Sequence, residues 1–169
     1  AIVGFSSLLK DGSTSKSEHD EFVNIIVKSS DHLLALISDI IDIAKIESGV
    51  LNITKGVFPV NDLMKDLYLV FQKRMKLEKR VSIDQLVLDI PRLAEEPMLD
   101  SDVNRVTQIV SNLLDNAIKF THKGTVTLGY RVESGYFRFF VSDTGIGIEP
   151  EKLGVVFMPF RQGDESISK

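Results

Sequence analysis

Apolar residues recur every three or four positions along the first fifty residues, which is the spacing of helices rather than strands. The first such run is Ile2, Phe5, Leu8 and Leu9. It predicts a helix that Gly12 ends, and the composition of residues 11–17 predicts a turn. Ser17 is expected to cap the next helix, and so short a connection predicts that the two helices are antiparallel.

A heptad pattern occupies the second helix. Its seam positions are Phe22, Ile26, Ser29, Leu33, Leu36, Ile40 and Ile43, and the neighbouring Ile25, Leu34, Ile37, Ile41 and Ala44 widen the apolar face. Gly49 is expected to end the helix. One short partner helix cannot cover a face of this width, so we expect residues 1–49 to form half of a four-helix bundle that a second copy of the chain completes.

Short apolar runs alternate with helical segments beyond residue 50. The expected elements are a short β-branched run over 50–60, a helix capped by Asn61 and reaching about Lys79, a strand over 81–88, a Pro-bounded turn at 91–97 and a helix over 102–120. Strands over 125–133 and 136–143 follow, joined by the hairpin dipeptide Ser134-Gly135. This order predicts an α/β sandwich over residues 50–169, with helices on one face of a mixed sheet, so the fold class is α+β.

Composition narrows the function classes. The chain has 169 residues, 43% of them apolar, and no cysteine, which excludes a disulfide framework and thiolate chemistry. Its net charge of −4 combines 20 basic with 24 acidic residues, so we expect neither a nucleic-acid partner nor membrane contact from this segment. The apolar runs are shorter than the ~20 residues that span a membrane. Because the chain starts at Ala1 inside an apolar pattern, we expect it to be a fragment.

Two polar motifs indicate a candidate ligand-binding site. Asn112, Asn116 and Lys119 recur at i, i+4 and i+7, so two carboxamides and an ammonium share one side of a helix. Taken alone, such a stripe also fits an ordinary solvated face. The second motif, Asp143-Thr144-Gly145-Ile146-Gly147-Ile148, directly follows an apolar strand, where a carboxylate would emerge beside a backbone that a ligand can approach closely. It lacks the third glycine of a Rossmann fingerprint.

Three segments of the chain resemble the N, G1 and F boxes of the sensor histidine kinases. They are residues 102–121 (DVNRVTQIVSNLLDNAIKFT), 143–148 (DTGIGI) and 157–162 (FMPFRQ). Residues 1–48 resemble the dimerisation and phosphotransfer hairpin of that family, and residues 50–169 resemble its ATP-binding domain of the GHKL type. The resemblance implies transfer of the ATP γ-phosphoryl group to a histidine and then to an aspartate of a response-regulator receiver domain, in the cytoplasm.

The resemblance also implies roles for individual residues. Asn112 would hold a Mg²⁺ ion that bridges the ATP phosphates, Asn116 and Lys119 would contact those phosphates, and Asp143 would accept from the adenine amine. Each role suits its side chain, because a carboxamide oxygen is a hard ligand and an ammonium is a point charge for phosphate. The remaining implied nucleotide-site residues are Phe120 against the base, Gly145 and Gly147 where the lid crosses the nucleotide, and Phe157, Phe160 and Arg161 of the F box.

The chain departs from the family pattern at both ends. None of His19, His32 and His122 lies in a box of the form His-acid-x-x-Thr/Asn-Pro, so all three are expected to be surface residues. The acceptor histidine is expected upstream of Ala1, and the second glycine box is expected just after Lys169. We therefore expect this segment by itself not to autophosphorylate.

Three alternatives remain at this stage. An ATPase resembling DNA gyrase, ninety-kilodalton heat-shock chaperones or mismatch-repair proteins would carry a water-activating Glu where this chain has Asn112, and an amide cannot act as a general base. A kinase resembling the anti-sigma-factor serine kinases would lack the long helix at 22–48. A non-catalytic dimerisation and nucleotide-binding module is distinguished by a nucleotide-binding measurement.

Overall fold

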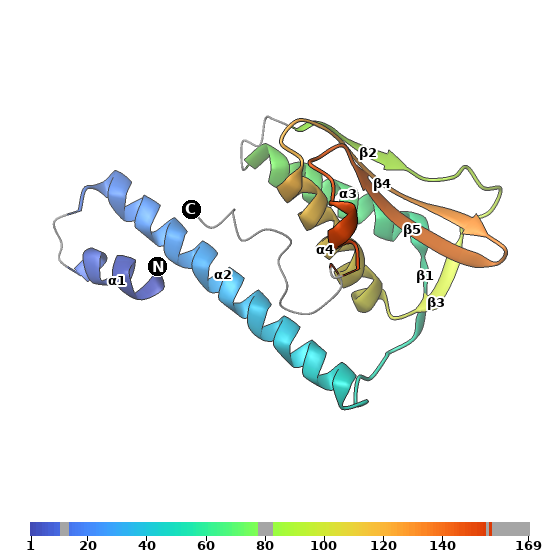
Figure 1. Ribbon diagram of the computed structural model, residues 1–169, viewed down its shortest axis with the longest axis horizontal. Helices are drawn as coiled ribbons and strands as arrows, with labels where there is room; N and C mark the ends of the chain where they lie inside the picture. The colour runs from blue at the N-terminus through green and yellow to red at the C-terminus, as the bar shows by residue number, and fades with distance from the viewer. Residues whose placement is uncertain (11–13, 78–82, 155, 157–169) are drawn as a thin grey trace. The chain divides into compact units, whose positions relative to one another are not determined.

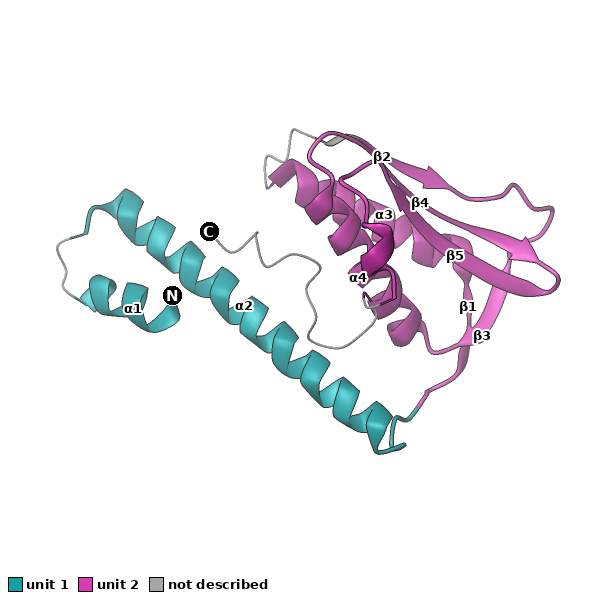
Figure 2. Cartoon of the chain, viewed as in Figure 1, with its two compact units in different colours: residues 1–52 teal, residues 53–169 magenta. Residues whose placement is uncertain are grey.

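The computed structural model describes residues 1–10, 14–77, 83–154 and 156. The chain divides into two compact units, Ala1–Asn52 and Ile53–Lys169, which we call the hairpin unit and the sandwich unit (Figure 2). None of the helices in the described segments has the length and apolar character needed to cross a membrane.

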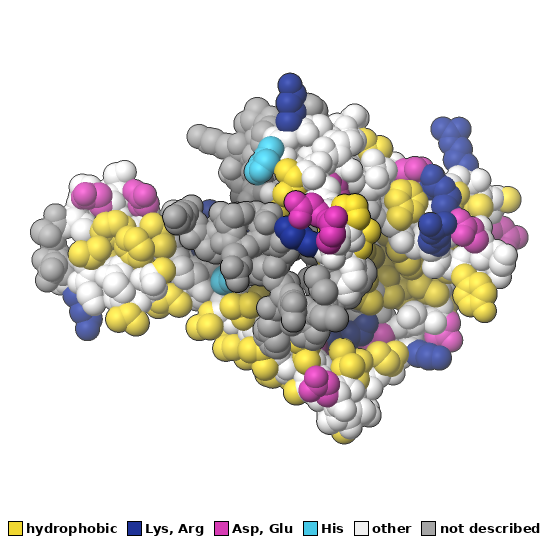
Figure 3. Space-filling view, viewed as in Figure 1, with side chains coloured by type: hydrophobic (Ala, Val, Ile, Leu, Met, Phe, Trp, Pro, Cys, Tyr) yellow, Lys and Arg dark blue, Asp and Glu magenta, His cyan; other side chains and the backbone are white. Residues whose placement is uncertain are grey.

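The hairpin unit consists of α1 (Ile2–Lys10) and the long α2 (Lys16–Glu47), which run antiparallel as expected (Figure 1). The rings of Phe5 and Phe22 pack with their centroids 5.1 Å apart. No residue of either helix is buried, and Leu36 and Ile40 of the predicted seam are 44% and 51% exposed. Hydrophobic side chains lie at the surface along the C-terminal half of α2 (Figure 3). The width of the apolar face therefore exceeds what α1 covers.

The start of α2 differs from the expectation. Ser15, not Ser17, is the N-cap: its hydroxyl accepts from the Glu18 N–H, and the Glu18 carboxylate accepts from the Ser15 N–H at 2.8 Å. The assignment of Ser17 was wrong because only Ser15 has a glutamate three residues on, which closes a capping box. At the other end, α2 stops at Glu47 and Gly49 takes a φ of 69°, which confirms that Gly49 ends the helix.

The sandwich unit contains five strands and two long helices among its described residues. In chain order they are β1 (Gly56–Pro59), α3 (Val60–Leu77), β2 (Ile83–Asp89), β3 (Met98–Ser101), α4 (Val103–Phe120), β4 (Gly124–Glu133) and β5 (Tyr136–Asp143), followed by a 3₁₀ turn, η1 (Pro150–Lys152). The main sheet has the order β2-β4-β5, with β2 parallel and β5 antiparallel to β4. Strands β1 and β3 form a separate antiparallel pair. The predicted helices on a mixed sheet are confirmed.

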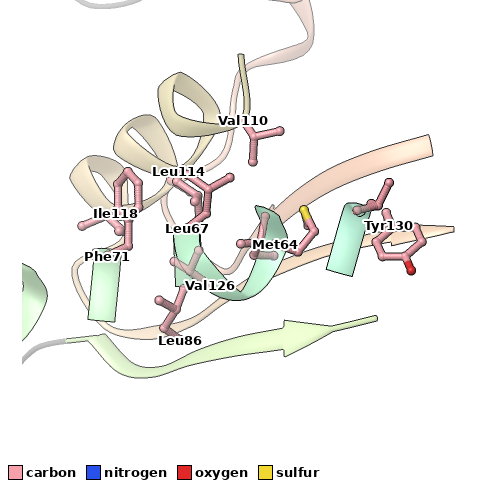
Figure 4. Packing of buried hydrophobic residues seen from close by; sticks show 12 residues of the cluster. Met64, Leu67, Phe71, Leu86, Val110, Leu114, Ile118, Val126 and Tyr130 are labelled. Carbon is pink, nitrogen blue, oxygen red and sulfur yellow. The ribbon is translucent and has the colours of Figure 1, made fainter. Parts of the chain in front are cut away.

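The core lies between α3, α4 and one face of the main sheet (Figure 4). Alternate residues of β4 point into it, and Val126, Leu128 and Tyr130 are fully buried. From the helices, Met64 and Leu114 are also fully buried. The Tyr130 hydroxyl is satisfied, because it donates to Asn61 Oδ1 at 2.7 Å.

Two details of this unit were not predicted correctly. Residues 98–101, between the predicted turn and the predicted helix, were assigned to no element, yet they form strand β3 and pair with β1. Asn61 does not cap α3 but is its second residue, and its amide donates to Glu96 while it accepts from Tyr130. A buried tyrosine hydroxyl needs a partner, and this need takes Asn61 away from capping. Lys79 and Val81 lie outside the described residues.

The β4–β5 hairpin agrees with its prediction. The register pairs Glu133 with Tyr136, which leaves Ser134 and Gly135 as the two turn residues. Both have positive φ, 51° and 84°, as a type I′ turn requires. This turn fixes the register of the whole hairpin, and therefore which face of the sheet each β5 residue occupies.

Candidate functional site

Helix α4 presents the predicted polar stripe to solvent. Its buried side consists of Val110, Leu114, Ala117 and Ile118. Asn112, Asn116 and Lys119 are exposed and, by the helical repeat, lie on the opposite side of the helix. The three side chains therefore share one open face, as their spacing predicts, and their polar groups are not consumed by the core.

Asp102 anchors the start of α4. It is only 6% exposed, and its carboxylate accepts from the backbone N–H groups of Asn104 and Arg105 in the first turn. The second carboxylate oxygen accepts from the N–H of Thr54 at 2.9 Å. The Thr54 bond is the largest cause that lowers the pKa of Asp102 below the ordinary value of an aspartic acid, with further lowering by the Arg105 and Asn104 bonds and the Arg105 charge, against partial desolvation. The position of α4 is thus tied to a segment far away in the sequence.

At the other end of α4, Lys119 and Phe120 form a local pair. The Lys119 ammonium lies 5.0 Å from the centroid of the Phe120 ring, which is half-buried. The face of an aromatic ring attracts a cation at this distance. The ammonium is therefore held near the last turn of α4, where the segment after Asp143 packs on this helix.

Asp143 is the last residue of β5 and pairs with Val126. Residues directly opposite in an antiparallel pair share one face of the sheet. Because Val126 is fully buried under the helices, Asp143 points to the helix-covered face, but at the sheet's end, where it is exposed. Its Oδ1 accepts from the Gly145 N–H at 2.9 Å. No other partner of this carboxylate occurs in the part of the chain that the structure describes.

The segment after Asp143 packs on the end of α4. The Ile146 N–H donates to the Phe120 carbonyl at 3.3 Å. A Cβ added at Gly145 would lie closer than 3.0 Å to that same carbonyl oxygen and to Asp143 Oδ1, so only glycine fits this position without a shift. The structure thus brings Phe120, Asp143 and Gly145 together, although these residues belong to two different sequence motifs.

The other predicted residues are placed less closely. Gly147 is exposed with a φ of 70°, a left-handed conformation that favours glycine, and no atom of the part of the chain that the structure describes lies within 4 Å of its hypothetical Cβ. Phe157, Phe160 and Arg161 lie outside the described residues. His19, His32 and His122 are all exposed, as expected, and the His19 Nδ1 lies 3.7 Å from Asp20 Oδ1.

Two threonines near the site were not singled out in advance. Thr144 binds the backbone of Thr125 through its N–H and its hydroxyl. Thr121 directly follows Phe120, is 3% exposed, and its hydroxyl oxygen finds no partner among the described residues. Each threonine lies within one of the quoted sequence motifs, but neither its hydrogen-bond partner nor its burial can be inferred from a single position.

The exposed polar side chains of α4 and of Asp143 determine which ligands the site can bind. They contain no group of three or more His, Asp or Glu side chains able to hold a metal ion. The α4 stripe instead offers carboxamide oxygens and one ammonium, and Asp143 offers a carboxylate acceptor. Such a set suits a ligand that brings its own negative charge at one end and an amine donor at the other.

Comparison with known families agrees with both units. Residues 1–49 match the His Kinase A (phospho-acceptor) domain. Residues 101–169 match the family of histidine kinase-, DNA gyrase B-, and HSP90-like ATPases, a match that includes α4 and the Asp143 segment. The fold and these two matches therefore define an ATPase-type domain joined to a phosphoacceptor-type hairpin.

Individual relatives are sensor kinases. The chain is 36% identical over 172 residues to the Autoinducer 2 sensor kinase/phosphatase LuxQ of Vibrio vulnificus, an alignment that covers 96% of this chain and 19% of LuxQ. Among solved structures, full-length ShkA in complex with AMPPNP matches with a TM-score of 0.67 at 25% identity, over 89% of this chain and 31% of ShkA. The histidine kinase ThkA, in complex with the response regulator protein TrrA, has the same fold (TM-score 0.69, 21% identity, 95% of this chain and 46% of that one). The chain belongs to the sensor histidine kinases of two-component systems, and it spans about a fifth of the length of its LuxQ relative.

Proposed function

We propose that this segment binds Mg-ATP in its sandwich unit and transfers the γ-phosphoryl group to a histidine outside this chain, from which it passes to a response-regulator aspartate. The observation that carries the proposal is the bond between the Phe120 carbonyl and the Ile146 N–H. It joins the Asp143 segment to the end of the helix that bears Asn112, Asn116 and Lys119. One ligand can therefore meet a carboxylate and the polar stripe together.

The roles within this site follow from the side-chain chemistry. We assign the adenine amine to Asp143, because its carboxylate keeps acceptor capacity beyond the Gly145 bond. Asn116 and Lys119 bind the phosphates, with Lys119 as the mobile point charge. Phe120 supports the base, and Gly145 lets the segment after Asp143 pack against the Phe120 carbonyl. Gly147 leaves room for the covering segment, to which Phe157, Phe160 and Arg161 belong.

The donor set also fits a magnesium ion. Mg²⁺ is held by few protein oxygens together with substrate phosphates and water, so a single carboxamide suffices where no carboxylate cluster is present among the described residues. We assign this ligand role to Asn112, which is exposed on the α4 stripe. When bound, the ion neutralises charge on the phosphates.

Hydrolysis by this site is disfavoured. A water-activating base would have to stand on the α4 stripe, and Asn112 is an amide that cannot take up a proton. The carboxylate that α4 does carry, that of Asp115, forms an ion pair with Arg74 of α3, with 2.6 Å between Asp115 Oδ1 and Arg74 Nη1. Transfer to a histidine needs positioning and charge neutralisation rather than activated water.

We propose two protein partners for this chain, a second copy of itself and a response-regulator receiver domain. We propose that residues 1–49 form a homodimer through the exposed apolar face of α2, and that residues 50–169 form the ATP-binding domain. The complex of ThkA with TrrA supports a receiver domain as the second partner, and AMPPNP in ShkA supports the nucleotide. Since ATP is the phosphoryl donor, we place this segment in the cytoplasm, without nucleic-acid or membrane contact.

The proposal is tested by titrating ADP and GDP, each with Mg²⁺, into the chain and into Asp143→Asn. Guanine presents a carbonyl where adenine presents its amine, so the carboxylate should repel GDP and bind ADP. We expect ADP to bind at least about tenfold more tightly than GDP, and Asp143→Asn to narrow this ratio. Equal affinities for ADP and GDP in the unmodified chain would remove Asp143 from the site.

A further inference from the structure

The ladder between β4 and β5 ends in an unusual way. Its last regular pair is Val126 with Asp143. One residue further on, the Thr144 N–H donates to the Thr125 carbonyl at 3.1 Å, as a continuing ladder would require. The return bond is different, because the Thr125 N–H donates to the Thr144 hydroxyl at 2.9 Å. A side-chain oxygen thus stands in for a backbone carbonyl.

Gly124 provides the space for this hydroxyl. It precedes Thr125, has a φ of 121°, and a Cβ placed on it would fall closer than 3.0 Å to Thr144 Oγ1. Any side chain at this position would displace the hydroxyl from the Thr125 N–H. Gly124 and Thr144 therefore fit one another at the open end of the hairpin, although one begins β4 and the other follows the last residue of β5.

Because the Thr144 hydroxyl, and not the Thr144 carbonyl, accepts from the Thr125 N–H, β5 can end at Asp143. With the Thr125 N–H already satisfied, the chain is free to turn after Thr144. After this turn the Gly145 N–H donates to Asp143 Oδ1, and the Ile146 N–H donates to the Phe120 carbonyl. The Asp143 carboxylate is held between these anchors.

We infer that Thr144 is a positioning residue for base recognition: its hydroxyl, seated in the space left by Gly124, sets the orientation of the Asp143 carboxylate. This inference rests on the proposed function, since it assumes that Asp143 reads the base. Without the hydroxyl, the Thr125 N–H would draw the Thr144 carbonyl into the ladder. The strand would lengthen by one residue, and Gly145 would leave its place against Phe120.

The test compares Thr144→Val with Thr144→Ser in the same chain. Valine keeps the shape of threonine but has no hydroxyl, whereas serine keeps the hydroxyl. We expect Thr144→Val to lose at least about tenfold in ADP affinity and to narrow the ratio of ADP to GDP affinity, and Thr144→Ser to stay within about threefold of the unmodified chain. Binding of tripolyphosphate with Mg²⁺, which reports on the α4 stripe alone, should be unchanged in both.

Each other outcome overturns the inference. An unchanged ADP to GDP ratio in Thr144→Val, an equal loss in Thr144→Ser, or a parallel loss of tripolyphosphate binding would show that the hydroxyl does not orient Asp143. Should Thr144→Val not fold, the unmodified chain still decides, since an unprotected Thr125 amide in hydrogen exchange would contradict the bond. A failure of the proposed function is separate, because it appears in the unmodified chain as equal ADP and GDP affinities.

Discussion

The carbonyl oxygen of Phe120 accepts the backbone N–H of Ile146 and lies where a Cβ on Gly145 would have to go. A helix end and a strand end are thereby joined through main-chain atoms, without a side chain between them. This contact places the carboxylate of Asp143 beside the last turn of α4.

Gly145→Ala should weaken both the fold and nucleotide binding, because the new methyl group meets the Phe120 carbonyl. Forcing a methyl group into a packed position costs about 1–3 kcal/mol of unfolding free energy. Urea denaturation and ADP titration measure the two effects. Gly154→Ala is the matched control, since no atom of the described residues lies within 4 Å of its hypothetical Cβ and its φ is not positive. Equal behaviour of the two variants would contradict the close packing.

Lys119→Ala should reduce the affinity for ADP and ATP while leaving the affinity for adenosine unchanged. The change removes a counter-charge for phosphate but not an adenine contact. A loss of about tenfold corresponds to about 1.4 kcal/mol, the scale of one charge-assisted hydrogen bond. Calorimetric titration with the three ligands separates the two ends of the site. If the affinity for adenosine fell by the same factor as the affinities for ADP and ATP, the Lys119 ammonium would not act by binding phosphate.

Asp102 should make the stability of the sandwich unit depend on acid pH. Its pKa in the fold lies below the ordinary value, chiefly because of the Thr54 bond, so the ionised form is the one that the fold stabilises. This contribution is fully present above the ordinary aspartate pKa of about 4 and is lost as the pH falls through the lowered pKa.

The check is urea denaturation of the unmodified chain and of Asp102→Asn at neutral pH and at several values below 4. Asparagine retains the N-cap oxygen for Asn104 and Arg105 but presents an amide to Thr54. We expect the variant to be less stable at neutral pH and to lose less stability on acidification. Parallel curves for the two proteins would show that another group carries the acid dependence.

Leu36→Glu should convert the proposed dimer into monomers. Leu36 belongs to the apolar face of α2 that α1 leaves exposed, and burying an unpaired carboxylate in a dimer interface costs several kcal/mol. Sedimentation velocity over a concentration series reports the change. Leu69→Glu, an exposed leucine on α3 of the sandwich unit, is the control and should remain dimeric. A monomeric unmodified chain at every concentration would contradict the dimer.

Thr121→Val should stabilise the sandwich unit by about 1 kcal/mol, because the buried hydroxyl finds no partner among the described residues and a methyl group needs none. Thermal unfolding measures the gain. Thr107→Val serves as the control, since the Thr107 hydroxyl donates to the Val103 carbonyl at 2.7 Å. A loss of stability in Thr121→Val would mean that its hydroxyl does form a bond in solution.

Local patterns predicted most of the elements, because each depends on residues close together in the chain. The positive φ values of Ser134 and Gly135 and the end of α2 at Gly49 follow from short-range sterics. The α4 stripe follows from the helical repeat. Two of the failures depend on distant partners, because Asn61 binds Tyr130 and β3 pairs with β1, and no local window contains either partner. The third, the N-cap of α2, was local: the capping box of Ser15 and Glu18 lies within four residues.

The candidate site was likewise predicted in part from local patterns and missed where distant segments meet. The exposed face that Asn112 and Lys119 share was predicted by the helical repeat, while the binding roles of these residues and of Asp143 stay predictions. The role of Gly145 was assigned to a covering segment, whereas in the structure its nearest neighbour is the Phe120 backbone. The Thr144 hydroxyl and the space at Gly124 form a pair that neither residue reveals alone. Shape complementarity between distant backbone segments is what the single sequence could not supply.

Every residue of α1 and α2 keeps contact with solvent in a single copy of the chain, since neither helix has a buried residue. A hairpin without an interior of its own gains stability only from what it associates with. In the dimer that we propose, folding of the hairpin unit and association are one equilibrium governed by mass action. The midpoint of its thermal unfolding should rise with protein concentration, while that of the sandwich unit, which has its own core, should not.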